Sequence, residues 1–391
     1  MEASIKAATV FVSKPENGPA GEDAGPKKKE EEMKGKMARR IPLLVLVAAL
    51  ALILGAAPAF AQKMKLKAAS IYPSPDLLMT MGKAMQVWQD EVTRRTNGDI
   101  TFETVWNSSL GSGPEHNELI SKGSIQVAQT FAWYTPGRFP LGAYTYVFPF
   151  GPTDPMLIVK ANRKLKEKFP QLRQDEEKQN VLRVCDAPGG PYDFMSKKPL
   201  RTNEDFKGEK ISLVGRYFGR WLPPGATAVV RGMQDRYELL QTGVVNIDLH
   251  PFTHFYHTKV YELAKYYTRV GMMAGFHSEI YVNLDVYKKL SPAYQKILKE
   301  AGDFTDEKMA GEILPQWQGV FEAEVKKFGV TFSDYPKAEV KKWADSLQDI
   351  PAEFADEVSK KGYPGFEFVK AWQDITTELG FQWARKWGVK K

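Results

Sequence analysis

The sequence predicts an α/β fold, and three observations carry that prediction. Residues 75–96 repeat apolar side chains at helical spacing, whereas residues 100–106 alternate as a half-buried strand does. A glycine and proline break at 188–191 separates two strand-like segments and is typical of a crossing between two lobes. A chain of 391 residues is long enough to give each lobe its own core.

The expected elements follow in chain order. The first half is expected to hold strands at 65–71, 100–106 and 125–130, helices at 75–96 and 115–122, and a loop rich in aromatics and proline at 131–152. The second half is expected to hold strands at 181–185, 192–196, 210–214, 244–248 and 281–283, with helices at 217–222 and 233–241. A long helix is expected over 291–328, and the region 338–391 is expected to be helical with breaks at Pro351, Pro364 and Gly365. Pro315 should bend the long helix, because proline lacks a backbone donor and clashes with the preceding turn.

The N-terminal segment has the three parts of a secretory signal peptide. A basic stretch at 33–40 precedes an apolar run at 41–57, and Ala59-Phe60-Ala61 matches the A-x-A cleavage pattern. We expect cleavage after Ala61 and a periplasmic mature chain. The alternative is a membrane anchor, although the run is slightly shorter than the ~20 residues of a spanning helix. The polar residues 1–32 leave Met1, Met33 and Met37 open as the start.

Composition argues against several classes of function. The formal net charge is +7, but lysine and arginine form no stripe that would indicate nucleic-acid binding. The single cysteine, Cys185, cannot form an internal disulfide and lies in an apolar, strand-like segment. The sequence contains no phosphate-binding loop, nucleophile elbow, H-E-x-x-H or C-x-x-C motif. We therefore expect neither an enzyme of a familiar class nor a cofactor.

Several short segments together resemble a known family. They are WNSSLG at 106–111, FPF at 148–150, KPL at 198–200, DFKGEKI at 205–211, YELLQTGVVN at 237–246 and YELAKY at 261–266. In this order, behind a signal peptide, they resemble the solute-binding proteins of tripartite ATP-independent periplasmic (TRAP) transporters, of the dicarboxylate-binding-protein-like type.

The resemblance implies a two-lobed periplasmic binding protein, with crossing strands and a long bent helix between the lobes. Lobe I is expected to comprise 62–188 plus 279–315, and lobe II 189–278 plus 316–391 with the C-terminal helices. The lobes would close like a hinge on a small organic solute, without covalent chemistry, and deliver it to the integral membrane permease of a TRAP transporter. Some relatives pair through added C-terminal helices, so monomer and homodimer both stay open.

The chain departs from the family at the position that matters most for an acidic solute. The family's arginine after the "GxK" segment grips a carboxylate with two parallel hydrogen bonds, but Ser212 stands there. We therefore expect a less acidic or more aromatic solute, and the alternative is that Arg216 or Arg138 restores the clamp. Aromatic residues crowd the expected cleft, namely Trp133, Tyr134, Phe148, Tyr192, Trp221 and Phe252. The expected ligand-binding residues are Trp133, Tyr134, Tyr192, Ser212, Gly215, Arg216, Met233, His250 and Phe252.

Three of the five histidines, His250, His254 and His257, lie within nine residues. On a helix their spacing would place them on one face, and three imidazoles with an open position suit catalytic zinc. An exported metal-dependent hydrolase is therefore the alternative function. However, Pro251 is expected to begin a helix after His250, which makes a common face uncertain. We expect His250 at the corner facing the cleft and no bound metal, and a pH-sensitive latch also stays open.

Overall fold

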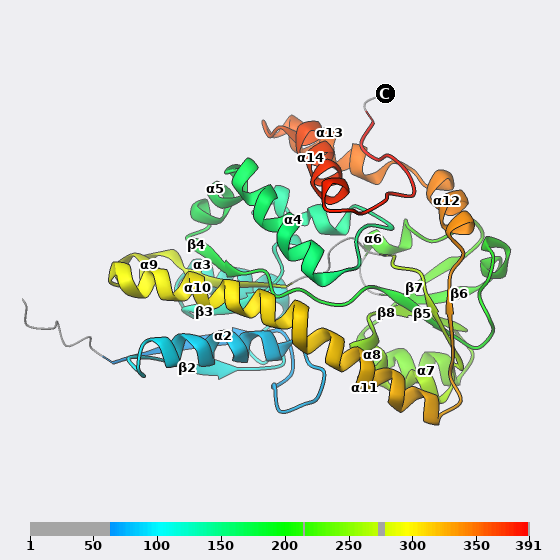
Figure 1. Cartoon of the computed structure of the whole chain (residues 1–391), viewed down its shortest axis with the longest axis horizontal. Helices are drawn as coiled ribbons and strands as arrows, with labels where there is room; N and C mark the ends of the chain where they lie inside the picture. The colour runs from blue at the N-terminus through cyan, green and yellow to red at the C-terminus, as the bar shows by residue number, and fades with distance from the viewer. Residues whose placement is uncertain (1–62, 214–215, 273–277, 390–391) are drawn as a thin grey trace, which may run out of the picture. The chain divides into compact units, whose positions relative to one another are not determined.

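Two β-sheets organise the fold in this computed structural model. The structure describes residues 63–213, 216–272 and 278–389, without the side chains of residues 216, 217 and 233. Helices cover both sheets, so the predicted α/β class is confirmed (Figure 1). Within these ranges no helix is long and apolar enough to cross a membrane. The expected signal peptide, residues 1–61, lies outside the described residues.

The first sheet has five strands in the order β2-β1-β3-β10-β4. Strand β1 runs parallel to its neighbours β2 and β3, whereas β10 runs antiparallel to its neighbours β3 and β4. The strands are β1 (Met64–Ser70), β2 (Ile100–Val105), β3 (Val127–Thr130), β4 (Val181–Cys185) and β10 (Glu279–Asn283). We call this sheet with its helices lobe I.

The second sheet has six strands in the order β11-β9-β5-β8-β6-β7, and we call it with its helices lobe II. Strands β6, β7 and β8 run parallel, whereas β5 is antiparallel to both β8 and β9. The strands are β5 (Asp193–Ser196), β6 (Lys210–Leu213), β7 (Thr227–Val230), β8 (Ile247–His250), β9 (Tyr266–Arg269) and β11 (Thr331–Asp334).

Before the C-terminal helices, the chain passes between the two lobes at three places. It leaves lobe I after β4 to enter β5, and it returns between β9 and β10. The third passage is a long helical segment made of α10 (Pro292–Lys308), a π-helical turn η6 (Met309–Ile313) and α11 (Leu314–Lys327), drawn from yellow to gold in Figure 1. Helix α10 packs on lobe I and α11 packs on α8 of lobe II. This is the expected pair of crossings with a long inter-lobe helix.

The change in direction of the long helix has a local cause. Pro315 removes a backbone donor, and its ring would clash with the carbonyl of the preceding turn. The wider π-helical turn η6 lies just before it, and such turns commonly mark kinks. Upstream, Gly302 allows α10 to touch β4, because an added Cβ would lie 1.5 Å from the carbonyl oxygen of Val184.

The remaining helices surround the two sheets. Lobe I carries α2 (Gly82–Arg95), α3 (Gly113–Ser121), α4 (Pro155–Lys168), α5 (Gln171–Lys178) and α9 (Leu284–Lys289), with the short turns η1 (Ala132–Tyr134) and η2 (Leu141–Tyr146). Lobe II carries α6 (Arg216–Gly219), α7 (Arg236–Gln241) and α8 (Phe252–Thr258), with the turns η3 (Asn203–Phe206), η4 (Met233–Asp235) and η5 (Val260–Glu262).

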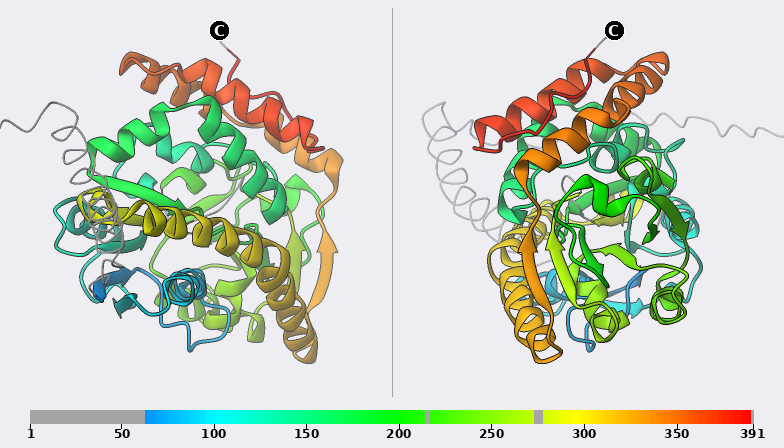
Figure 2. Two further views of the ribbon diagram at one scale, coloured as in Figure 1. Left: turned by 60° about the vertical axis from the view of Figure 1, so that its left-hand side comes forward. Right: turned by 90° about the vertical axis from the view of Figure 1, so that its right-hand side faces the viewer.

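The C-terminal helices are divided between the lobes. Trp343 of α12 (Lys337–Ser346) is buried against Phe194 and Phe206 of lobe II. Helix α14 (Gly365–Glu378) instead packs on α4, and α13 (Ile350–Lys360) packs on α14 and η2. Both helices, in orange-red and red, lie side by side in Figure 2. The ring centroid of Trp372 lies 5.2 Å from that of Tyr144 in η2. These two helices were expected with lobe II, but Tyr144 of η2 and Phe169, just after α4, offer ring contacts to Phe368 of α14.

Candidate functional site

Side chains from both lobes meet in one group of rings, which we call the aromatic cluster. Its members from lobe I follow the ends of β1 and β3, which run parallel and therefore end at the same sheet edge. Its members from lobe II lie at the crossing before β5 and in α6 after β6. The aromatic cluster consists of Tyr72, Phe131, Trp133, Tyr134, Tyr146, Tyr192 and Phe218.

Ring contacts run through the cluster from one lobe to the other. Trp133 and Tyr146 have ring centroids 4.4 Å apart, and Tyr192 stacks on Phe218 at 4.7 Å. Tyr146 meets Phe218 edge to face at 6.0 Å, which joins the two lobes. Both the stacked and the edge-to-face arrangements are favourable for aromatic rings. The two lobes therefore contact each other through these rings.

A buried polar triad of Ser212, Arg236 and Asp248 lies on the lobe II side. Ser212 of β6 is paired in register with Asp248 of β8, so their side chains are neighbours on one face of the sheet. Arg236 begins α7 and donates from Nη1 to the Ser212 hydroxyl at 2.7 Å and to the Asp248 carboxylate. The Ser212 hydroxyl also donates to Asp248. All three side chains are fully buried.

The histidines extend from this triad. His250 ends β8, and its ring stacks between Tyr192 at 5.8 Å and His254 of α8 at 4.7 Å. Burial, with the nearby charge of Arg236, lowers the pKa of His250 well below its usual value. Burial, His257 and Arg236 together lower the pKa of His254 to about 3. Both imidazoles are therefore neutral at neutral pH.

The geometry does not favour the metal-site hypothesis. His250 and His254 lie face to face with an interplanar angle of 15°, so their ring edges do not converge on one point. Histidine, cysteine and carboxylate side chains in the described ranges form no group of three that could hold a metal ion. His257 lies further along α8 against the backbone of Met79 from lobe I. Among the described residues, these histidines therefore do not form the metal centre that the hydrolase alternative would require.

Several polar atoms at the aromatic cluster are buried and find no hydrogen-bond partner among the described residues. They are both ring nitrogens of His250, the indole nitrogen of Trp133 and one carboxylate oxygen of Asp248. The Tyr72 hydroxyl faces that of Ser278 without completing a hydrogen bond. A buried polar atom without a partner costs about 1–3 kcal/mol. A polar solute at this place would satisfy these groups.

The structure brings together five of the nine expected ligand-binding residues, which are Trp133, Tyr134, Tyr192, Ser212 and His250. Phe252 packs instead against Phe321 of α11, in the core beneath α8. Gly215 and the side chains of Arg216 and Met233 lie outside the described residues. Of two further aromatics expected in the cleft, Phe148 packs on Trp383 instead, whereas the buried ring of Trp221 lies edge to face against Phe218 of the cluster at 4.8 Å.

Sequence reasoning missed the cation that reaches Ser212. The expected substitutes were Arg216 and Arg138, but Arg138 contacts the Ser121 hydroxyl of α3 at 3.5 Å instead. Arg236 fills the place, and no motif marked it. Asp248 could have been found, because alternate residues of a strand share a face and His250 was already a candidate. Tyr72, Tyr146 and Phe218 were also missed.

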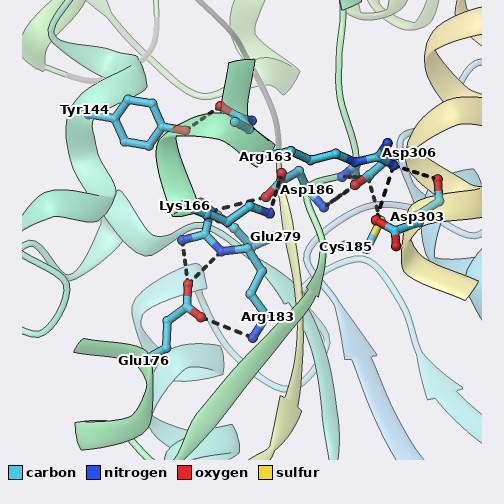
Figure 3. Close-up of polar contacts among 12 residues, drawn as sticks. Tyr144, Arg163, Lys166, Glu176, Arg183, Cys185, Asp186, Glu279, Asp303 and Asp306 are labelled. Atoms are coloured by element: carbon cyan, nitrogen blue, oxygen red, sulfur yellow. Dashed lines mark hydrogen bonds and ion pairs between the residues drawn. The ribbon is translucent and has the colours of Figure 1, made fainter. Parts of the chain in front are cut away.

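A charged network behind the cluster holds the crossing (Figure 3). Asp306 of α10 accepts hydrogen bonds from the backbone N–H groups of Asp186 at 3.0 Å and Ala187 at 2.8 Å, and from the Cys185 thiol at 3.0 Å. Arg183 is buried beside Glu176 and Asp186 and lies 4.0 Å from Glu279. Burial also raises the pKa of the Cys185 thiol, which argues against a role as a nucleophile.

A separate surface cavity of about 490 Å³ offers less to a solute. Its lining includes Asp193 and Arg269. The Asp193 carboxylate already accepts hydrogen bonds from the backbone of Val270 and Gly271 and from the Tyr267 hydroxyl. Arg269 pairs with Glu322 and Asp334. The aromatic cluster therefore remains the stronger candidate.

Comparison with known proteins identifies the family. The model of bacterial extracellular solute-binding proteins of family 7 matches residues 76–357. The ectoine/5-hydroxyectoine-binding periplasmic protein UehA of Ruegeria pomeroyi is 24% identical over 225 residues, which is 56% of this chain and 65% of that protein, just under two thirds of its length. The uncharacterized protein YiiZ of Salmonella typhimurium is 24% identical over 68% of this chain and 81% of its own.

Solved structures share the fold. A TRAP periplasmic solute-binding protein from Desulfovibrio salexigens superposes with a TM-score of 0.71 at 21% identity, covering 81% of this chain and 97% of that one. A marine metagenome TRAP protein specific for aromatic acid ligands has a TM-score of 0.66 at 20% identity, covering 82% of this chain and all of that one. Since the family model matches most of the chain, the protein belongs to the bacterial extracellular solute-binding proteins of family 7, and its two-lobed fold is that of the TRAP periplasmic solute-binding proteins.

Proposed function

We propose that this protein is an extracytoplasmic receptor that binds one small organic solute at the aromatic cluster and delivers it to a TRAP-type membrane permease. The observation that carries the proposal is the set of buried, unpartnered polar atoms surrounded by rings from both lobes. Because each lobe supplies only part of this set, hinge closure completes the site and binding favours the closed form.

The relatives support the class of ligand. UehA is described as binding ectoine and 5-hydroxyectoine. Structural neighbours hold 3-hydroxybenzoate, orotic acid, benzoate or d-glucuronate. All of these are small organic molecules, and most contain a ring. Aromatic side chains such as Trp133 and Tyr192 suit the flat faces of such solutes.

The mode of binding differs from the contact that the resemblance implies. Ser212 cannot form two parallel hydrogen bonds with a carboxylate, since a hydroxyl carries one donor. Trp133, Tyr134, Tyr192 and His250 orient the solute instead. Residues 1–61 are the leader that directs export, with cleavage after Ala61, and no covalent chemistry takes place at the site.

Native mass spectrometry of the mature chain, residues 62–391, tests the proposal. A receptor that closes over its solute keeps it through purification, so we expect a small organic mass that is released on denaturation. A stoichiometric zinc mass together with turnover of an ester or amide would contradict the proposal and favour the hydrolase. Saturable binding without turnover would separate a receptor from an enzyme.

A further inference from the structure

The arginine near Ser212 already has a carboxylate partner within the protein. Arg236 reaches from α7 toward the position that the resemblance assigns to the family's arginine, and it donates to the Ser212 hydroxyl. The same Nη1 donates to Asp248, which accepts from Ser212 as well. The remaining contacts of the guanidinium are long, at 3.3 Å to the carbonyl of Gly232 and 3.4 Å to that of Arg231. The acid group that this arginine holds is therefore a side chain of the chain itself.

The pair is difficult to separate. Arg236 and Asp248 are both fully buried, and breaking a buried ion pair leaves an uncompensated charge away from water. A solute carboxylate would have to displace Asp248 or lie beside it, and two carboxylates close together repel each other. The triad thus disfavours an anionic solute at the point where the family's arginine would attract one.

The described charges around the cluster add no free cation. His250 and His254 are neutral, because burial and Arg236 lower the pKa of each. On the lobe I side, Glu279 lies near the rings, and burial together with its charge raises the pKa of Tyr134 to about 12. Arg183 lies 4.0 Å from Glu279 and also pairs with Glu176 and Asp186. Every described cation near the site is therefore matched by a carboxylate.

The unpartnered atoms indicate what the site accepts. A neutral imidazole offers one donor and one acceptor, the Trp133 indole offers a donor, and the free oxygen of Asp248 offers an acceptor. These groups fit an uncharged solute that carries both N–H or O–H donors and carbonyl or hydroxyl acceptors. The surrounding rings favour a flat or cyclic body.

We propose that Asp248 is an internal counterion that occupies Arg236 in place of a ligand carboxylate, so that the site selects an uncharged, ring-bearing polar solute over the corresponding acid. This inference rests on the receptor function proposed above and names its ligand class. It makes Asp248 a specificity-determining residue of the site. An amide, lactam, cyclic imide or sugar would bind, and its acid counterpart would be rejected.

The experiment uses pairs of probes that differ in charge and little else. Benzamide is compared with benzoate, uracil with orotate, and glucose with glucuronate, by isothermal titration of residues 62–391. The solute released in native mass spectrometry is identified, and its charge at neutral pH is noted. We expect the released solute to be uncharged. In any pair of probes that binds, we expect the uncharged member to bind at least tenfold more tightly than its acid counterpart.

Two variants make the role of Asp248 explicit. Asp248→Asn keeps the shape but leaves Arg236 without its counterion, so we expect acids to bind at least tenfold more tightly than to the wild type. The double variant Asp248→Asn with Arg236→Met removes both charges and should show no gain for acids. Circular dichroism checks that both variants fold, and the wild-type preference decides the question if either does not. Arg216→Ala serves as a further control, because Arg216 is one of the two arginines expected as alternative partners of a solute carboxylate.

The outcomes separate this inference from the receptor function. A released anionic solute, tighter binding of acids to the wild type, or a folded Asp248→Asn variant without a gain for acids would overturn the counterion role and leave the receptor in place. Loss of acid binding in Arg216→Ala would name the residue that restores the clamp. If no solute is released and no probe binds, both the receptor function and this inference fail.

Discussion

Replacing Asp306 by asparagine tests how the crossing between the lobes is held. The side chain accepts backbone hydrogen bonds from Asp186 and Ala187 and one from the Cys185 thiol, and Oδ1 takes part in all three. Asparagine retains one such oxygen but carries no charge. The substitution therefore separates the hydrogen-bonding role of Asp306 from the effect of its charge.

The magnitude follows from the pKa of the carboxyl group. Burial, and next the charge of Asp186, raises the pKa of Asp306 to about 6. Because the folded chain binds this proton more tightly than the unfolded chain, the contribution to stability is largest below about pH 4 and falls as the pH rises through about 6. A difference of about two pKa units corresponds to about 3 kcal/mol of lost stability at pH 7.

We therefore expect Asp306→Asn to unfold like the wild type near pH 4 and to be more stable by up to about 3 kcal/mol at pH 7. Asp306→Ala leaves two buried N–H groups without an acceptor and should lose about 2–6 kcal/mol near pH 4, where the wild-type carboxyl group is protonated. Urea denaturation at pH 4, 5, 6 and 7 measures both. Parallel pH profiles of wild type and Asp306→Asn, or a less stable Asp306→Asn at pH 7, would refute the reasoning.

Three further predictions address packing and closure. Gly302→Ala should lower the free energy of unfolding by at least about 3 kcal/mol, because the new Cβ would lie 1.5 Å from the Val184 carbonyl oxygen. The control Gly319→Ala, in the open part of α11, should leave the free energy of unfolding unchanged or raise it by about 1 kcal/mol. Equal melting temperatures of the two variants would contradict this prediction. Phe218→Ala removes the lobe II partner of Tyr146 and should weaken solute binding at least tenfold. Solution scattering should show a larger radius of gyration for the ligand-bound variant than for the ligand-bound wild type. An unchanged radius of gyration would argue against ring packing as part of closure. Solute affinity should change less than threefold between pH 5.5 and 8, because His250 and His254 stay neutral over that range. Titration calorimetry measures this affinity, and a tenfold change would restore the pH-latch hypothesis.

The sequence predicted the types of most elements better than their ends. The helix expected at 75–96 begins only at Gly82, because Met79 takes a left-handed backbone conformation with φ 62° and Thr80 bonds to Pro73 and Gly82. Periodicity could not show this, since the apolar residues of 75–81 fit a helix equally well. Pro315 indicated the bend of the long helix. The π-helical turn before it was not predictable, because it depends on the packing of α10 on lobe I and of α11 on lobe II.

Residues of the candidate site could be named from the sequence where a local motif marked them. Trp133 and Tyr134 follow a strand, Ser212 occupies a motif position, and His250 precedes a helix-starting proline. Arg236 was not predictable, because its role depends on the adjacency of β6 and β8, which places Ser212 and Asp248 side by side. The same holds for Tyr146 and Phe218, which come together only when both lobes are folded. The partner of the C-terminal helices likewise depends on tertiary packing.

The division of the C-terminal helices between the lobes bears on how freely the lobes can move relative to each other. Arg385 donates to the carbonyls of Ala344 and Leu347 at the end of α12, and Asp349 bonds to the backbone of Gly388. The segment between α12 on lobe II and α13 on lobe I is thus clamped rather than loose. We expect such a clamp to narrow the set of lobe orientations in the free chain, and to raise the population of binding-competent molecules before any solute arrives. Apparent affinity scales with that population, so part of the receptor's affinity would come from the segment between α12 and α13, which does not contact the solute.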